Sequence, residues 1–75
     1  MKEMVEFIAK SLVNDKDAVV VTELEGEDSI IITLSVAESD MGKVIGRQGR
    51  IAKSIRTIIK AATAKSEKPV FLEIR

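Results

Sequence analysis

Two glycines three residues apart, Gly46 and Gly49, enclose the pair Arg47-Gln48 near the middle of the chain. Glycine has no Cβ atom, so the backbone at these positions can approach a sugar–phosphate strand closely. Arg47 and Gln48 offer side-chain donors for phosphate oxygens, and a helix that starts after Gly49 adds free N–H groups and a partial positive charge. Residue types and spacing together favour binding of a phosphate backbone.

The glycine loop lies in a stretch of the chain without acidic residues. Residues 41–66 contain seven basic side chains and no Asp or Glu, whereas residues 1–40 hold three Lys and ten acids. The formal net charge of +0 is therefore the sum of segments that carry −7, +7 and 0. Segregated charge leaves a local patch that attracts a polyanion, although the neutral total alone would argue against one. The seven basic residues are Lys43, Arg47, Arg50, Lys53, Arg56, Lys60 and Lys65.

Two familiar nucleotide-binding loops do not fit this spacing. A P-loop needs glycines five apart followed by Lys and Ser or Thr, and the dinucleotide fingerprint needs G-x-G-x-x-G after a strand. Here Gly42 and Gly46 are four apart and follow a predicted helix. The structural alternative is a glycine C-cap and a tight turn between two helices with a solvated polar face. We expect Gly42 to serve close packing or capping and not ligand contact.

Composition narrows the function classes further. The 75 residues suit one small domain, and the absence of Cys and His removes the commonest nucleophile, general base and metal ligands. We therefore expect no enzyme, no metal and no cofactor. Charge interrupts the apolar residues at the N-terminus, and no apolar run approaches the roughly 20 residues that span a bilayer. The prediction is a cytoplasmic protein that does not bind a membrane.

Hydrophobic periodicity predicts six elements in the order α-β-β-α-α-β. The two β-branched runs read as a hairpin, since a turn cluster at 25–28 separates them. Ser39 or Asp40 is expected to cap the short helix before the glycine loop. This order predicts an α+β domain in which helices cover one face of a three-stranded sheet. The predicted helices are 2–13, 41–45 and one that starts at 51 and that the segment 65–69 ends, and the predicted strands are 18–24, 29–36 and 70–75.

The segment 51–62 gives the strongest periodic signal, with an Ile/Ala stripe on one side and basic residues on the other. Four like charges on one helix face cost helix stability, which favours a functional reason for them. Arg50 and Lys53 extend the path of phosphate contacts from the loop. Arg56 and Lys60 lie farther away and are assigned to the general surface or to a protein partner.

Aromatic residues bear on the kind of nucleic-acid recognition. The chain has only Phe7 and Phe71, and both are predicted to lie in the core. Readers that stack bases on exposed rings are therefore disfavoured. An aliphatic groove remains possible, with Ile45, Ile51 and residues of the second strand as candidates for its lining, and core packing as the alternative for each.

The segment from Asp40 to Arg56, in this element order, resembles the KH domain. The α-β-β-α-α-β order is similar to the prokaryotic, type II arrangement, and the resemblance covers residues 1–75 as a single KH domain. The Val-Ile-Gly-x-x-Gly-Arg core is a specific signal when it follows a hairpin and opens a basic amphipathic helix. The glycine loop matches the family pattern without departure.

The resemblance implies binding of about four nucleotides of single-stranded RNA, with the loop gripping the backbone. It further implies a homodimer, or pairing with a larger RNA-binding partner of the KhpB (Jag/EloR) type. Post-transcriptional regulation and a link to cell shape, through elongation and division, are implied in the same way. The candidate RNA-binding residues are Lys43, Ile45, Gly46, Arg47, Gln48, Gly49, Arg50 and Lys53.

A second hypothesis stays open beside RNA binding. Small size, the aliphatic Ile31 and the wide Ile/Ala stripe at 51–62 also suit a module that mainly dimerises or docks on a protein, with incidental RNA binding. The two functions are compatible, because two short sites in one dimer raise the overall affinity.

Overall fold

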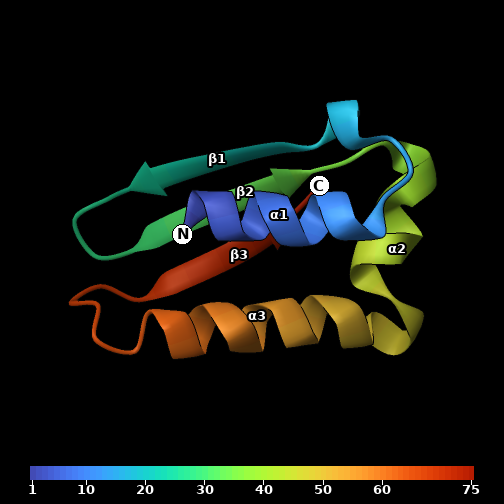
Figure 1. The fold of residues 1–75 in the computed structure, drawn as a ribbon. Helices are drawn as coiled ribbons and strands as arrows, with labels where there is room; N and C mark the ends of the chain where they lie inside the picture. The colour runs from blue at the N-terminus through green and yellow to red at the C-terminus, as the bar shows by residue number, and fades with distance from the viewer.

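The helices and strands follow the predicted order (Figure 1). The computed structural model describes residues 1–75. Its boundaries lie within two residues of the predicted ones, and the first strand begins late because Lys16–Ala18 form a short 3-10 turn. The elements are α1 (Lys2–Leu12), β1 (Val20–Glu25), β2 (Ile30–Ser35), α2 (Met41–Ile45), α3 (Arg50–Ala62) and β3 (Val70–Ile74).

The three strands form one mixed sheet in the order β1-β2-β3. β1 and β2 pair as an antiparallel hairpin, as predicted, and β3 joins β2 in parallel. A parallel neighbour needs a crossover connection, and α2 and α3 supply it here. The sheet and the helix order agree with the α+β domain predicted from the sequence.

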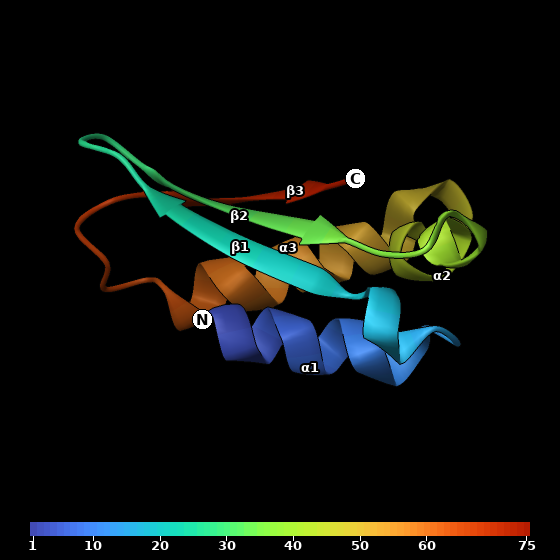
Figure 2. The ribbon, with the colours of Figure 1, turned by 90° about the horizontal axis from the view of Figure 1, so that it is seen from above.

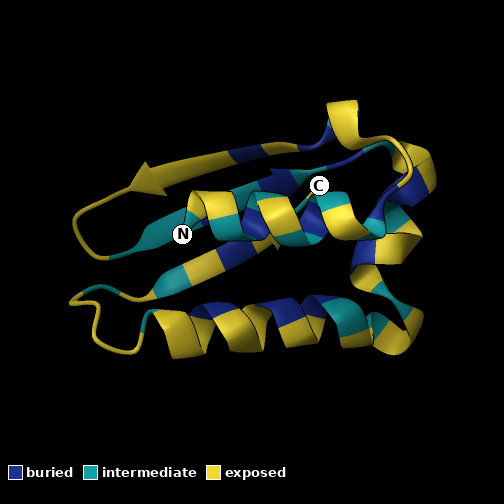
Figure 3. Cartoon of the chain, viewed as in Figure 1, coloured by how far each residue is buried: buried dark blue, intermediate teal, exposed yellow.

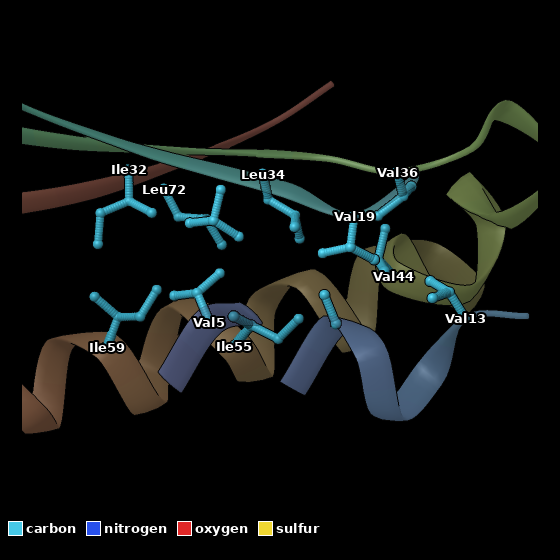
Figure 4. Close-up of a cluster of buried hydrophobic side chains, with 12 residues drawn as sticks. Val5, Val13, Val19, Ile32, Leu34, Val36, Val44, Ile55, Ile59 and Leu72 are labelled. Carbon is cyan, nitrogen blue, oxygen red and sulfur yellow. The ribbon is translucent and has the colours of Figure 1, made fainter. Parts of the chain in front are cut away.

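Two helices cover one face of the sheet, and no element covers the other (Figure 2). α1 and α3 lie side by side on the covered face, while α2 stands at the end of the sheet where β2 finishes. Strand residues that alternate in sequence point to the same face. Ile32 and Leu34 of β2 are accordingly fully buried against the helices, with Leu72 of β3 beside them (Figure 4).

The prediction that both aromatic rings lie in the core is wrong. Phe7 is 73% exposed on α1 and Phe71 is 55% exposed on β3. Phe71 falls between Val70 and Leu72, so strand alternation turns its side chain away from the buried Leu72 and toward the uncovered face. Phe7 lies on the side of α1 opposite the buried Val5 and Ala9.

Candidate nucleic-acid interface

The loop between α2 and α3 adopts a backbone that most residues avoid. φ is +77° at Gly46, +59° at Gln48 and +74° at Gly49. Glycine reaches positive φ without steric cost, whereas the left-handed conformation of Gln48 is strained. Three of four consecutive residues with positive φ make a sharp corner, and this corner turns the chain from α2 into α3.

The two glycines are required for different reasons. A Cβ atom on Gly46 would lie 2.6 Å from Cγ1 and 2.9 Å from the backbone nitrogen of Ile51, so no other residue fits. A Cβ atom on Gly49 would meet nothing within 4 Å. Only the positive φ therefore selects glycine at position 49, and the space beside it is open to a ligand. Gly42 also has nothing within 4 Å of a Cβ position, so the predicted close packing there is wrong.

The loop has internal backbone bonds at its end and polar side chains at its tip. The N–H of Gly49 donates to the carbonyl of Gly46 at 3.1 Å, and the N–H of Arg50 donates to the carbonyl of Arg47. Arg47 and Gln48 are exposed, so their two polar side chains face solvent at the tip of the loop. This set of donors matches the oxygens of a phosphate group.

The basic residues that follow the loop are not neutralised. Arg47, Arg50 and the four basic residues after them up to Lys65 are exposed and make no ion pair with an acid. The guanidinium of Arg50 donates only to Oε1 of Gln48, at 3.3 Å. Figure 3 marks the outward side of α3 and the loop as exposed. The surface therefore carries uncompensated positive charge along one helix, which attracts an anionic strand.

Lys43 differs from the other basic residues of the acid-free stretch. Its Nζ lies 3.4 Å from Oδ1 of Asp40, a carboxylate that is almost fully buried. The structure thus places Lys43 on the helix before the loop but commits its charge to an internal partner.

Asp40 does not cap α2 as predicted, because its side chain makes no capping hydrogen bond to that helix. The N–H of Asn14 donates to Oδ1 at 3.2 Å and the N–H of Asp15 donates to Oδ2 at 3.0 Å. The Asp15 bond is the largest cause that lowers the pKa of Asp40 below its ordinary value; burial opposes the shift, and Asn14 and Lys43 reinforce it. The carboxylate is therefore ionised at neutral pH.

The two aliphatic candidates for a base-binding groove have different environments. Ile45 is 37% exposed at the end of α2, directly before the loop, so its side chain is available to a ligand. Ile51 is partly buried, packs against the core and touches the space beside Gly46. The outcome favours Ile45 as a surface residue and the core-packing alternative for Ile51.

The structure also contains a cavity that sequence reasoning did not place. A hollow of about 470 Å³ lies between the C-terminal half of α3, the following loop and β3. Ile59 and Leu72 contribute apolar lining, and all charged residues of the lining are cations, namely Arg56, Lys60 and Lys68. The side chain of Arg56 donates to the carbonyl of Leu72 at 3.4 Å across the groove between α3 and β3.

The second strand, which was the predicted source of groove residues, does not line this cavity. β2 is the central strand, whereas β3 is the edge strand that lines the cavity together with α3. The sequence feature that could have indicated this cavity is the four-residue spacing of Arg56 and Lys60, since it puts both on the same side of α3. Lys68 gave no signal, because it follows the helix in a loop.

Comparison with known proteins shows the family. A family model described as KhpA/KhpB, KH domain, matches residues 2–74. The chain belongs to this family. It is similar to the RNA-binding protein KhpA of Clostridium acetobutylicum, with 62% identity over 74 residues that cover 99% of each chain. It is also similar to the RNA-binding protein KhpA of Aquifex aeolicus, with 53% identity over 99% of this chain and 94% of that protein.

Membership in this family agrees with the fold and with the class of protein predicted from the sequence. The KH family is non-enzymatic, and its relatives here are named for RNA binding. The chain is accordingly not an enzyme. None of its helices has the length and apolar character needed to cross a bilayer.

Proposed function

We propose that this chain is a non-catalytic RNA-binding protein whose Gly46–Gly49 loop grips the backbone of about four nucleotides of single-stranded RNA. The observation that carries the proposal is the loop itself. It combines open space beside Gly49, the exposed polar side chains of Arg47 and Gln48, and cations that no acid neutralises. The names of the KhpA relatives support RNA as the polyanion.

The path of the RNA beyond the loop follows from charge and exposure. Arg50 and Lys53 continue the contacts to phosphate along α3, and Ile45 provides an apolar contact next to the loop. The cavity between α3 and β3 offers space for unstacked bases, since it joins apolar walls to the cations Arg56 and Lys60, whereas Lys68 is paired with Glu25. Lys43 contributes least of the eight candidates, because Asp40 already holds its ammonium group.

A charge-reversal variant tests the clamp. In Arg47→Asp/Gln48→Asp, two carboxylates replace the donors at the loop tip, and we expect the affinity for octauridine to fall by about a hundredfold at moderate salt. Fluorescence anisotropy with a labelled strand measures the change. The control Lys2→Asp/Ser11→Asp alters the net charge equally on α1, at two exposed positions. Equal losses in both variants would show that only total charge matters, and no loss in the loop variant would refute the clamp.

We further infer that the protein associates through the exposed Ile58, at the edge of the apolar stripe of α3, with a second copy or with a KhpB-type protein. Ile58 supports this, because it is 45% exposed on a helix whose neighbouring Ile55 and Ile59 are buried. The family description joins KhpA and KhpB under one KH domain. Light scattering of Ile58→Lys against the native chain tests the inference. We expect a dimer that becomes a monomer, and a native chain that stays monomeric at high concentration argues against self-association.

RNA binding and association together suit a cytoplasmic post-transcriptional regulator that acts as a dimer or with a partner. A dimer carries two loops, so one RNA strand with two suitable segments binds with higher apparent affinity than either segment alone. Comparing the native chain with Ile58→Lys on short and long oligouridines separates the two roles. If the protein is mainly a docking module with incidental RNA binding, the loop variant should associate with its protein partner as strongly as the native chain does.

A further inference from the structure

One buried charge is not explained by the core or by helix capping. Asp40 is 1% exposed and is the only polar or charged residue among the buried side chains. A buried carboxylate is costly unless its oxygens are bonded, and both oxygens of Asp40 are. On its own helix the carboxylate meets only the ammonium group of Lys43, at 3.4 Å, and both of its backbone donors belong to another segment.

Asp40 joins two segments that are distant in the sequence. Its carboxylate oxygens accept from the N–H groups of Asn14 and Asp15, which follow α1 and lie 26 and 25 residues away. Asp40 itself ends a short 3-10 turn, and α2 begins at the next residue. The carboxylate therefore ties the end of α1 to the beginning of α2.

The helix that Asp40 holds is the one that carries the glycine loop. α2 has only five residues, so it is too short to be stable without tertiary contacts. Only Val44 of this helix is buried, and it packs near Val13 and Val36 (Figure 4). Asp40 fixes one end of α2, and Gly46 leaves from the other end. Any shift of α2 is therefore passed directly to the loop.

We propose that Asp40 is a positioning residue for RNA binding, whose carboxylate anchors α2 to the chain after α1 and so holds the Gly46–Gly49 loop in its binding geometry. The readout with RNA rests on the proposed function. The anchor itself is a property of the free protein.

The sign of the charge makes this proposal testable. Asp40 is an acid six residues before Gly46, and it neutralises Lys43. If only electrostatics mattered, removing this negative charge would strengthen the binding of a polyanion. Positioning predicts the opposite, because an amide at residue 40 turns donors toward the N–H groups of Asn14 or Asp15 and loses the anchor.

The experiment compares Asp40→Asn with Glu38→Gln. Glu38 is an exposed acid in the same 3-10 turn, so its variant removes equal charge and leaves the anchor in place. Anisotropy with labelled octauridine is measured where circular dichroism shows both variants folded. We expect Asp40→Asn to bind roughly tenfold more weakly than the native chain, and Glu38→Gln to bind equally or slightly more tightly. Equal or tighter binding by folded Asp40→Asn overturns the proposal.

A second variant covers the case in which Asp40→Asn does not fold. Asp15→Pro removes one donor and leaves the carboxylate in place, and φ at Asp15, −95°, must shift by about 30° to reach the value that proline adopts. We expect it to weaken binding although it too removes an acid. Binding at or above the native affinity overturns the proposal.

Amide spectra of the free proteins separate this inference from the function on which it rests. Loss of the anchor should shift the signals of Gly46 and Gly49 without any RNA, whereas Glu38→Gln should leave both in place. If the native chain fails to bind octauridine, the RNA proposal fails, and these two signals alone decide whether Asp40 positions the loop. Unmoved signals in both anchor variants overturn it.

Discussion

The two long helices solve the same packing problem with different surfaces. α1 and α3 lie side by side on one face of the sheet, and each buries one stripe of apolar residues (Figure 1). On α1 the outward charges are of both signs, and the Nζ of Lys10 donates to Oε1 of Glu6 at 3.1 Å. On α3 every outward charge is positive, and none is paired with an acid.

The difference shows which features folding does not need. Opposite charges one turn apart stabilise a helix, and like charges at the same spacing destabilise it. α1 has the favourable pattern of charges, although both helices bury an apolar stripe against the sheet. The loop before α3 adds strain at Gln48, which has φ of +59°. Because neither the charges nor the strain stabilises the fold, we attribute both to a ligand.

The largest expected effect comes from Gly46→Ala, which introduces a clash with the first turn of α3. The new methyl group would clash with the side chain and the backbone nitrogen of Ile51, and the positive φ of residue 46 is strained for alanine. We therefore expect a loss of about 3 kcal/mol in the free energy of unfolding. RNA binding should be lost as well, because the Gly46–Gly49 loop must change its backbone conformation to relieve the clash. Urea unfolding measures the first and anisotropy the second. A variant as stable as the native chain would mean that the loop relaxes freely.

Gly49→Ala sharpens the same point with a smaller effect. The position has positive φ but no neighbour within 4 Å, so only conformational strain opposes the methyl group. We expect a loss of roughly 1 kcal/mol in the free energy of unfolding. RNA affinity should fall more than stability does, since the methyl group fills the space intended for the strand. Unchanged affinity in the folded variant would show that RNA does not approach this glycine.

A matched pair of lysines tests the contrast between the helices directly. Lys53→Gln removes an unpaired charge on α3, and we expect affinity to fall a few-fold and the salt slope to fall by about 0.7. Lys10→Gln removes a paired charge on α1 and should leave RNA binding unchanged, with a stability loss of about 0.3 kcal/mol. Titrations at several salt concentrations give both slopes. Equal salt slopes for the two variants would contradict the claim that α3 contacts RNA and α1 does not.

The smallest expected effect is the dependence of stability on pH, which Asp40 causes only in acid. The folded pKa lies below the ordinary 3.8, so the ionised carboxylate contributes stability that is fully present above 3.8. That contribution is lost as the pH falls through the folded value. The thermal unfolding temperature of the native chain should therefore fall more steeply below pH 3.8 than that of Asp40→Asn. Parallel curves for the two proteins would contradict the assignment.

Local patterns in the sequence predicted what depends on local chemistry. The periodicity of 51–62 and the alternation around Ile32 set the elements and their buried faces, and the structure agrees. The loop boundaries followed from Gly46 and Gly49, since glycine marks positive φ. Such signals lie within a few residues of the feature that they predict.

The errors concern contacts between distant segments. Strand alternation puts Phe71 on the face opposite Leu72, but only the packing of α1 and α3 on the other face leaves it uncovered. Asp40 looked like a helix cap, but its partners at Asn14 and Asp15 arrive through the tertiary fold. The cavity beside Arg56 exists because β3 becomes the edge next to α3. Hydrophobic patterning is silent on each of these.

The most direct test of the account is a titration of the isotope-labelled protein with octauridine, followed by amide nuclear magnetic resonance. The account predicts the largest shifts at residues 46–50, smaller shifts along the basic side of α3, and none along α1. Addition of salt should reverse them. Shifts that concentrate on α1 or the uncovered sheet face, with Arg47, Gln48 and Gly49 unmoved, would contradict it.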